Sequence, residues 1–205
     1  MKYEWRKVEK SIYLPGTKPE SIVVPKFNFV AIEGKGDPNG PDFSDRVEAL
    51  YSISYAIRMM PKKGFTPEGY FEYTVYPLEG LWDLSEDGRV NTELDKSQLL
   101  YKIMIRQPDF VTQEVFNKVI ETVKKSKPNL LIDELKLEAI EDGFSVQMMH
   151  LGSYENEKKS FDLMKTYIKD NSLKIKTMVH REIYLSDPRK SEPEKLKTVL
   201  RYMVE

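Results

Sequence analysis

The order of apolar segments repeats along the chain, and this repetition limits the folds that the chain can adopt. The first series reads FNFVAIEG, a helix, YFEYTVYP and YKIMIRQP, and the second reads FSVQMMHLG, a helix, TMVHREIYLS and KTVLRYMV. Each predicts strand, helix, strand, strand, because apolar residues alternate in the strand segments and recur every three or four positions in the helices. The sequence therefore predicts an α+β fold of two duplicated units, whose two antiparallel half-sheets are related by a pseudo-twofold axis.

These units are expected to form one domain of 205 residues. Its expected parts are an extended arm over residues 1–26, a first repeat over 27–107, a connecting helix over 108–134 and a second repeat over 135–205. The expected strands cover residues 27–33, 70–76, 98–106, 135–140, 144–151, 177–185 and 197–204, and the longer helices cover 43–60, 112–126 and 154–170. Thr112 is expected to cap the connecting helix, the segment EDG to form a hairpin turn, and PLEGLWDLSEDG to form a loop.

Composition and charge exclude several classes of function. The formal charge is −1, with 32 basic and 33 acidic residues evenly mixed, so no nucleic-acid surface is expected. Apolar runs stay far below the length of about 18 residues that a membrane span needs. The chain has 0 cysteines and 2 histidines, too few ligands for an ordinary zinc site. A cytoplasmic monomer or homodimer is expected, with no metal, cofactor, membrane or nucleic-acid partner.

A carboxylate in the middle of a predicted strand is the strongest candidate for a functional group. Alternation along residues 177–185 places Glu182 on one face with Met178, His180 and Tyr184. The helices are expected to cover the opposite face. An antiparallel sheet can show one face to water, so a solvated Glu182 remains an alternative. If the two halves curve together, this face lines a pocket that attracts cations and flat aromatic molecules.

Two further glutamates are candidates for a second carboxylate. Glu72 lies 12 residues after Met60, the expected end of the first helix, as Glu182 lies 12 residues after Asp170. The repeat favours Glu72, whereas the segment PLEGLW draws attention to Glu79, and the choice between them stays open.

Three aromatic residues complete the set of expected ligand-binding groups. Trp82 either fills the core or lines the pocket, Tyr154 opens the helix of the second repeat, and Tyr101 lies on the last strand of the first. His180 and Met178 are expected to bind the ligand, and His150 is expected to be structural.

The stretch HREIYLSDPR, with the preceding HLGSYENE and the final SDPRKSEPEKLKTVLRYMV, resembles the GyrI-like small-molecule-binding superfamily. GKGDPN and YPLEGLW are similar to its stand-alone branch, and the resemblance covers nearly the whole chain. It implies two strand–helix–strand–strand repeats around a groove and places the family's ligand-binding glutamate at Glu182. Family members include drug-binding domains of multidrug-responsive regulators and hydrolases that open the cyclopropane of DNA-alkylating antibiotics.

Two functions are therefore expected, with the enzyme favoured. In the first, the protein hydrolyses strained-ring (cyclopropanoid) genotoxins without a cofactor. Glu182 then activates water, Tyr184 or Tyr154 stabilises the developing phenolate, and Trp82 orients the substrate. In the second, a non-catalytic module binds, sequesters or senses aromatic cations at the same glutamate.

Overall fold

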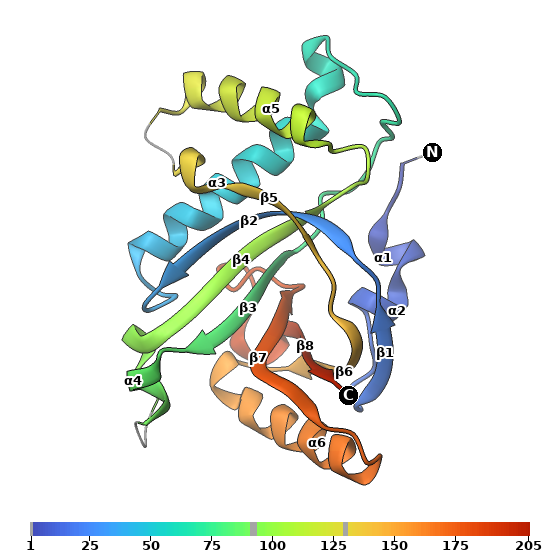
Figure 1. Cartoon of the computed structure of the whole chain (residues 1–205), viewed down its shortest axis with the longest axis vertical. Helices are drawn as coiled ribbons and strands as arrows, with labels where there is room; N and C mark the ends of the chain where they lie inside the picture. Colours follow the sequence, from blue (N-terminus) through green and yellow to red (C-terminus); the bar gives the residue numbers. More distant parts are fainter. Residues whose placement is uncertain (1, 91–93, 129–130) are drawn as a thin grey trace. The chain divides into compact units, whose positions relative to one another are not determined.

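The computed structural model describes residues 2–90, 94–128 and 131–205 and divides the chain into two compact units (Figure 1). The first unit contains residues 2–4, Phe27–Leu78 and Asp83–Ile140, and the second contains Trp5–Lys26, Glu79–Trp82 and Glu141–Glu205. Strands and helices occur in both units, so the α+β fold class is confirmed.

The first unit contains β2 (Phe27–Lys35), α3 (Pro41–Arg58) and β4 (Leu99–Gln107) of the first repeat. The remaining strand of this repeat, β3 (Leu78–Leu84), is divided, because its residues Glu79–Trp82 belong to the second unit. β2 and β4 pair antiparallel, and β5 (Lys136–Ile140) pairs with the other edge of β2. α3 packs on β2 and β4 and buries Leu50, Ile53 and Ile57, whose spacing of three and four residues forms one apolar stripe. α5 (Gln113–Ser126) packs against α3. The Thr112 hydroxyl accepts a hydrogen bond of 3.3 Å from the amide of Val115, which confirms the predicted cap.

The second unit repeats this topology with β6 (Gly143–Leu151), α6 (Glu157–Asp170), β7 (Ile175–Tyr184) and β8 (Lys197–Val204). β6 pairs antiparallel with β8, and β8 with β7, so the first strand of the repeat lies beside the third, as β2 lies beside β4. An outer strand, β1 (Glu20–Val24), pairs with β6 as β5 pairs with β2. The predicted duplication is therefore present in the strand pairing.

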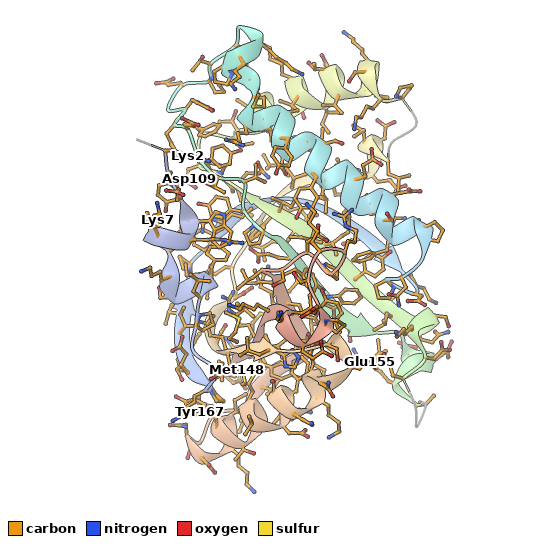
Figure 2. The ribbon with its side chains drawn as sticks, turned by 180° about the vertical axis from the view of Figure 1, so that it is seen from behind. Lys2, Lys7, Asp109, Met148, Glu155 and Tyr167 are labelled. Carbon is orange, nitrogen blue, oxygen red and sulfur yellow. The ribbon has the colours of Figure 1, made fainter. Side chains whose placement is uncertain are left out.

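α6 covers one face of the second unit's strands (Figure 1). Its Met164 and Ile168 pack in one cluster with Met148 of β6 and Leu200 of β8. Figure 2 labels Met148, which belongs to this cluster, and Tyr167 of α6, whose side chain packs against it. This cluster anchors the helix that carries part of the candidate site.

The predicted strand over residues 70–76 is wrong. In the structure this segment is irregular except for an isolated bridge between Tyr3 and Tyr73, and the strand is β3, where a loop was predicted. The aromatic residues of the segment pack ring to ring: Phe110 lies 5.1 Å from Tyr70 and 5.6 Å from Phe71 between ring centroids. Aromatic residues are enriched in strands because they pack well there, and here they pack equally well outside a sheet.

The prediction of an extended arm over residues 1–26 is wrong for part of this segment. It contains α1 (Trp5–Val8), α2 (Lys10–Tyr13) and β1, and the buried rings of Trp5 and Tyr13 lie 5.0 Å apart. Residues Trp5–Lys26 belong to the second unit, where β1 pairs with β6.

The segment EDG does not form the predicted hairpin. β5 pairs with β2, whereas β6 pairs with β1 and β8. Asp142, in the middle of EDG, is buried and forms ion pairs with Arg181 and Arg201, so it does not lie in an exposed turn.

The remaining elements are short. They are the 3-10 turns η1 (Met60–Lys63), η2 (Lys96–Gln98), η3 (Ile132–Glu134), η4 (Tyr154–Asn156) and η5 (Pro193–Lys195), and the helix α4 (Glu86–Arg89). Within the described ranges, no helix combines the length and the apolar character needed to cross a membrane.

Candidate functional site

A chain of hydrogen bonds surrounds Glu182 in the second unit. The Tyr184 hydroxyl donates to Glu182 Oε2 over 2.7 Å, and His180 Nε2 lies 3.0 Å from Oε1. A carboxylate only accepts hydrogen bonds, so Nε2 of His180 carries the proton in this contact. Trp82 Nε1 donates to the Tyr184 hydroxyl over 2.7 Å. Glu182 is only 9% exposed, and each of its carboxylate oxygens accepts a hydrogen bond from a fixed donor.

Helix α6 covers the face of β7 that carries Glu182. His180 lies opposite Tyr202 in the pairing of β7 and β8, and the ring of Phe161 on α6 lies 4.8 Å from the His180 ring. The prediction that the helices cover the opposite face is therefore wrong for this unit. Alternation assigns residues to two faces, but it does not determine which face a helix covers.

The position of Trp82 depends on Gly80. A side-chain Cβ at Gly80 would lie 2.6 Å from Trp82 Nε1, much closer than van der Waals contact. The two residues share one face of β3, because side chains two positions apart point to the same side of a strand. The missing Cβ in the segment LEGLW therefore leaves room for the indole that reaches Tyr184.

Tyr154 provides the more exposed aromatic surface of the site. Its ring meets the Tyr184 ring edge-on, with centroids 6.0 Å apart, and the residue is 40% exposed. Burial raises the pKa of Tyr154 to about 12. Burial and the charge of Glu182 raise the pKa of Tyr184 as well, so both phenols keep their protons at neutral pH.

A second carboxyl group, which the sequence analysis missed, lies beside this site. Glu157 is the first residue of α6 and is 7% exposed, and its Oε1 is buried without a hydrogen-bond partner among the described residues. Burial, followed by the charge of Glu182, raises the pKa of Glu157 to about 9. A helix N-terminus favours an ionised carboxylate by only about 0.3–1 kcal/mol, too little to offset this burial. The carboxyl group of Glu157 therefore keeps its proton at neutral pH.

Glu157 carries no distinctive sequence signal. An acidic residue in the first turn of a helix is common and normally faces solvent. The segment HLGSYENE contains it, but only the packing of α6 on the strands buries it.

The opposite face of β7 carries a buried ionic network. Arg181 donates to Glu79 over 2.9 Å and to both oxygens of Asp142 over 2.7 and 2.6 Å. Arg201 donates to Asp142 over 3.0 Å and to the carbonyl of Ile12 over 3.1 Å. Burial alone would raise the pKa of Asp142, but the two guanidinium groups outweigh it and hold that pKa below its usual value. This network joins β3, β7 and β8 to the N-terminal segment behind the Glu182 site.

A family model for the GyrI-like small molecule binding domain matches residues 17–204. The chain belongs to the GyrI-like family. Two solved structures described as hydrolases from Listeria innocua are 39% and 40% identical to it, with TM-scores of 0.91 and 0.93, and each match covers 100% of both chains. The C-terminal domain of EcmrR shares the fold at 15% identity and a TM-score of 0.51, over 92% of this chain and 97% of that domain. A search of curated proteins returned no match.

The structure of this GyrI-like domain brings together five of the predicted site residues: Glu182, Tyr184, His180, Trp82 and Tyr154. The other four lie elsewhere. Met178 is 52% exposed on β7, and Glu79 belongs to the ionic network on the opposite face. Glu72 has a 62% exposed side chain 3.9 Å from Arg58, and Tyr101 lies in the first unit.

Those two first-unit residues have local partners. The Tyr101 hydroxyl lies 3.2 Å from Asp42 Oδ2, and its ring packs edge-on to Phe43. Glu72 lies on the surface because its segment forms no strand of the sheet.

His150 has a structural environment, as expected. Its Nε2 donates to the carbonyl of Ser153 over 3.0 Å, and its Nδ1 lies 2.9 Å from the hydroxyl of Ser160. The described part of the chain contains no group of three or more acidic or histidine residues that could hold a metal ion.

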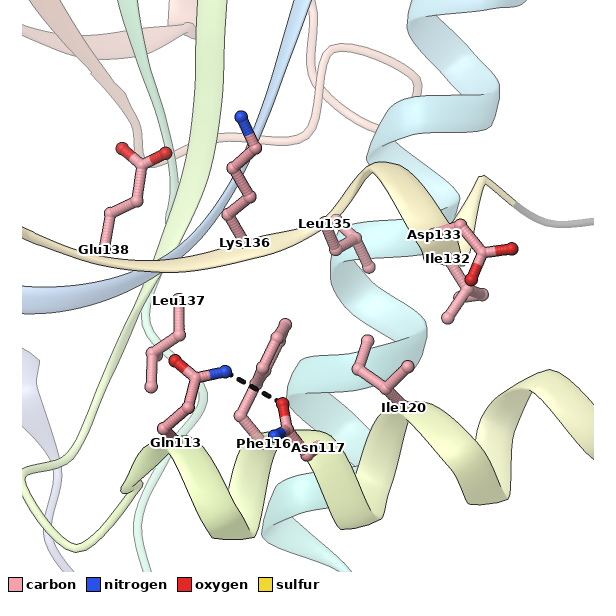
Figure 3. Close-up of a pocket in the computed structure, with 10 residues that line it drawn as sticks. All are labelled: Gln113, Phe116, Asn117, Ile120, Ile132, Asp133, Leu135, Lys136, Leu137 and Glu138. Carbon is pink, nitrogen blue, oxygen red and sulfur yellow. Dashed lines mark hydrogen bonds between the residues drawn. The ribbon is translucent and has the colours of Figure 1, made fainter.

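The first unit of the GyrI-like domain has a separate depression of about 440 Å³ between α5 and β5 (Figure 3). It is lined by Gln113, Phe116, Asn117, Ile120, Ile132, Asp133, Leu135, Lys136, Leu137 and Glu138. Its carboxylates are neutralised, because Asp133 pairs with Lys124 and Glu138 pairs with Lys102. None of the predicted site residues lines it, so its position does not support a role in the Glu182 chemistry.

Proposed function

We propose that this GyrI-like domain binds aromatic, cationic or electrophilic small molecules at Glu182 and hydrolyses strained-ring, cyclopropanoid compounds. The observation that carries the proposal is the sheltered Glu182 carboxylate, which two donors orient. Tyr154 supplies exposed aromatic surface in this site, and the buried Trp82 holds the Tyr184 hydroxyl, as suits a site for flat apolar ligands. The two Listeria proteins described as hydrolases, at 39% and 40% identity, favour turnover over binding alone.

In the proposed reaction, Glu182 acts as the general base. A water oxygen bonds to a methylene carbon of the cyclopropane while the bond between that carbon and the conjugated ring breaks. The released electron pair moves through the ring to its carbonyl oxygen, which becomes a phenolate. Glu182 takes a proton from the water, and the protonated Glu157 gives one to that oxygen. The product is a phenol with a hydroxyalkyl chain, which is 2-hydroxyethyl when the substrate is a simple spirocyclopropyl cyclohexadienone. The raised pKa of Glu157 suits it to the role of general acid. Proton exchange with solvent then removes the proton from Glu182 and returns one to Glu157.

The tyrosines have different roles in this mechanism. The Tyr184 proton already binds Glu182, and its oxygen accepts the Trp82 indole N–H. Tyr184 therefore orients the base, whereas Tyr154 is the phenol better placed to stabilise the developing phenolate or to stack on the substrate.

The test is hydrolysis of a spirocyclopropyl cyclohexadienone in ¹⁸O-labelled water, followed by mass spectrometry. The proposal expects ring-opened product in molar excess over protein, with one ¹⁸O incorporated. Glu182→Gln should lower the rate by about 10²- to 10⁴-fold while the fold is retained. The matched control is Glu72→Gln, which changes an exposed glutamate of the first unit and should leave the rate unaltered.

Stoichiometric binding without product would replace the hydrolase with the second candidate, a non-catalytic module that binds or sequesters such compounds. The same carboxylate favours that alternative, because it would neutralise a ligand cation. The absence of saturable binding by any aromatic ligand would reject both functions.

A further inference from the structure

We propose that the Glu182 site exchanges a proton for an organic cation: a cation that binds there displaces the proton held by Glu157. This inference rests on the proposed function only in assuming that ligands bind at Glu182, and it does not require turnover. It assigns Glu157 as a second charge-accepting group and makes the site selective for cations in a pH-dependent way.

The first support is an unsatisfied buried atom. Oε1 of Glu157 is buried and has no hydrogen-bond partner among the described residues. The Thr198 hydroxyl is also buried without a hydrogen-bond partner among the described residues. Thr198 lies opposite Tyr184 in the pairing of β7 and β8. In the described part of the second unit, these are the two buried side-chain atoms without a partner. Buried polar atoms are nearly always satisfied, so their concentration in one site indicates that something else binds there.

The second support is the arrangement of charges around Glu157. The groups that interact with Glu157 are Glu182 and Tyr184 on β7 and Tyr154 in η4. The next titratable groups are His180, which contacts Glu182, Asp187, whose charge acts on Tyr154, and His150, which contacts Ser160 of α6. None of these groups carries a fixed positive charge. The buried arginines of this unit, Arg181 and Arg201, instead neutralise Asp142 on the opposite face of β7. A ligand cation would therefore supply the positive charge that the Glu182 face lacks.

A bound cation changes the protonation of Glu157 through its charge. Burial and the charge of Glu182 keep the pKa of Glu157 near 9, so its carboxyl is protonated at pH 7.5. A positive charge beside the two carboxyl groups favours the ionised form of both, and Glu157 then loses its proton. A neutral ligand of similar shape provides no such charge and leaves the proton in place.

Isothermal titration calorimetry tests the exchange directly. Tetraphenylphosphonium, a permanent aromatic cation, and triphenylphosphine oxide, a neutral relative, are titrated into the protein at pH 8 in buffers of different ionisation enthalpy. The wild-type protein should release close to one proton per bound cation and almost none per neutral ligand. Its affinity for the cation should rise roughly tenfold per pH unit between pH 7 and 8.5, whereas its affinity for the oxide stays constant.

Glu157→Gln is the decisive variant, because an amide has the shape of the protonated carboxyl. It should bind the cation without releasing a proton and lose the pH dependence. Glu155→Gln changes an exposed glutamate in the same segment (Figure 2) and should behave as the wild type does. Proton release that persists in Glu157→Gln would assign the proton to another group, such as His180, and overturn the inference.

The wild-type measurement remains decisive if the variant does not fold. Cation binding without proton release overturns the exchange and leaves the proposed function intact. Failure of both ligands to bind overturns the exchange and the proposed function together.

Discussion

The Tyr184 hydroxyl donates a 2.7 Å hydrogen bond to Glu182 Oε2 from two residues along the same strand. Donor and acceptor thus share one face of β7, and their spacing depends on the pleat of a single strand. Trp82, from β3, donates to the same hydroxyl. The base of the candidate site is therefore oriented by rigid sheet elements, and this rigidity makes its parts separately testable.

Gly80→Ala should disconnect Trp82 from Tyr184. The new Cβ would lie 2.6 Å from the indole nitrogen, so the ring must move and the hydrogen bond is lost. We expect a loss of about 1–3 kcal/mol in the free energy of unfolding and weaker ligand binding. Urea unfolding and tryptophan fluorescence, in a Trp5→Phe background that isolates Trp82, measure both effects. Gly16→Ala is the control because its Cβ would meet nothing closer than 4.0 Å; equal stability of the two variants would contradict the prediction.

Glu79→Gln should destabilise the fold much more than Glu72→Gln. Glu79 is buried against Arg181, and removal of one partner from a buried ion pair typically costs about 3–5 kcal/mol. Glu72 is exposed, and its substitution should change stability by less than about 0.5 kcal/mol. Chemical denaturation of the two variants at pH 7 provides the comparison. Similar losses would show that the network behind the site contributes little.

Glu157→Gln should change how stability depends on pH. The pKa of Glu157 is about 9 in the folded protein against 4.5 for an ordinary glutamate, so between these values the folded state holds a proton that the unfolded state has lost. The free energy of unfolding should therefore fall as pH rises through this window, by up to about 1.4 kcal/mol per pH unit from this group. Urea unfolding from pH 5 to 9 should show a shallower decline in Glu157→Gln than in the wild type. A curve that keeps the wild-type slope would place the titrating group elsewhere.

His180→Phe should impair ligand binding and turnover more than folding. The phenyl ring can keep the packing of His180 against Phe161 and Tyr202, but it cannot donate to Glu182. Hydrogen bonds to charged groups contribute about 1.5–3 kcal/mol, so binding or kcat/KM should fall about 10- to 100-fold. Calorimetry and product assays, with thermal unfolding as the folding control, measure the two effects. A variant as active as the wild type would remove His180 from the site.

Local patterns were sufficient for much of the fold. The strand over residues 197–204 is β8 with the same limits, and the connecting helix begins after Thr112 as predicted. The duplication was visible because the same element order occurs twice, and β6 and β8 pair as β2 and β4 do. The group of Glu182, Tyr184 and His180 was also predictable, since alternation along one strand places all three on one face.

Tertiary structure decided everything that depends on distant partners. β3 forms over Leu78–Leu84 and not over the aromatic segment before it, and the N-terminal segment supplies β1. Glu157 and Glu79 are both glutamates in unremarkable local sequence, yet one is buried beside a second carboxylate and the other beside an arginine. Periodicity along the chain determines where a side chain points relative to its own backbone, because backbone geometry sets that direction. Burial and pKa are properties of the space around a side chain, and residues far away in the sequence fill that space.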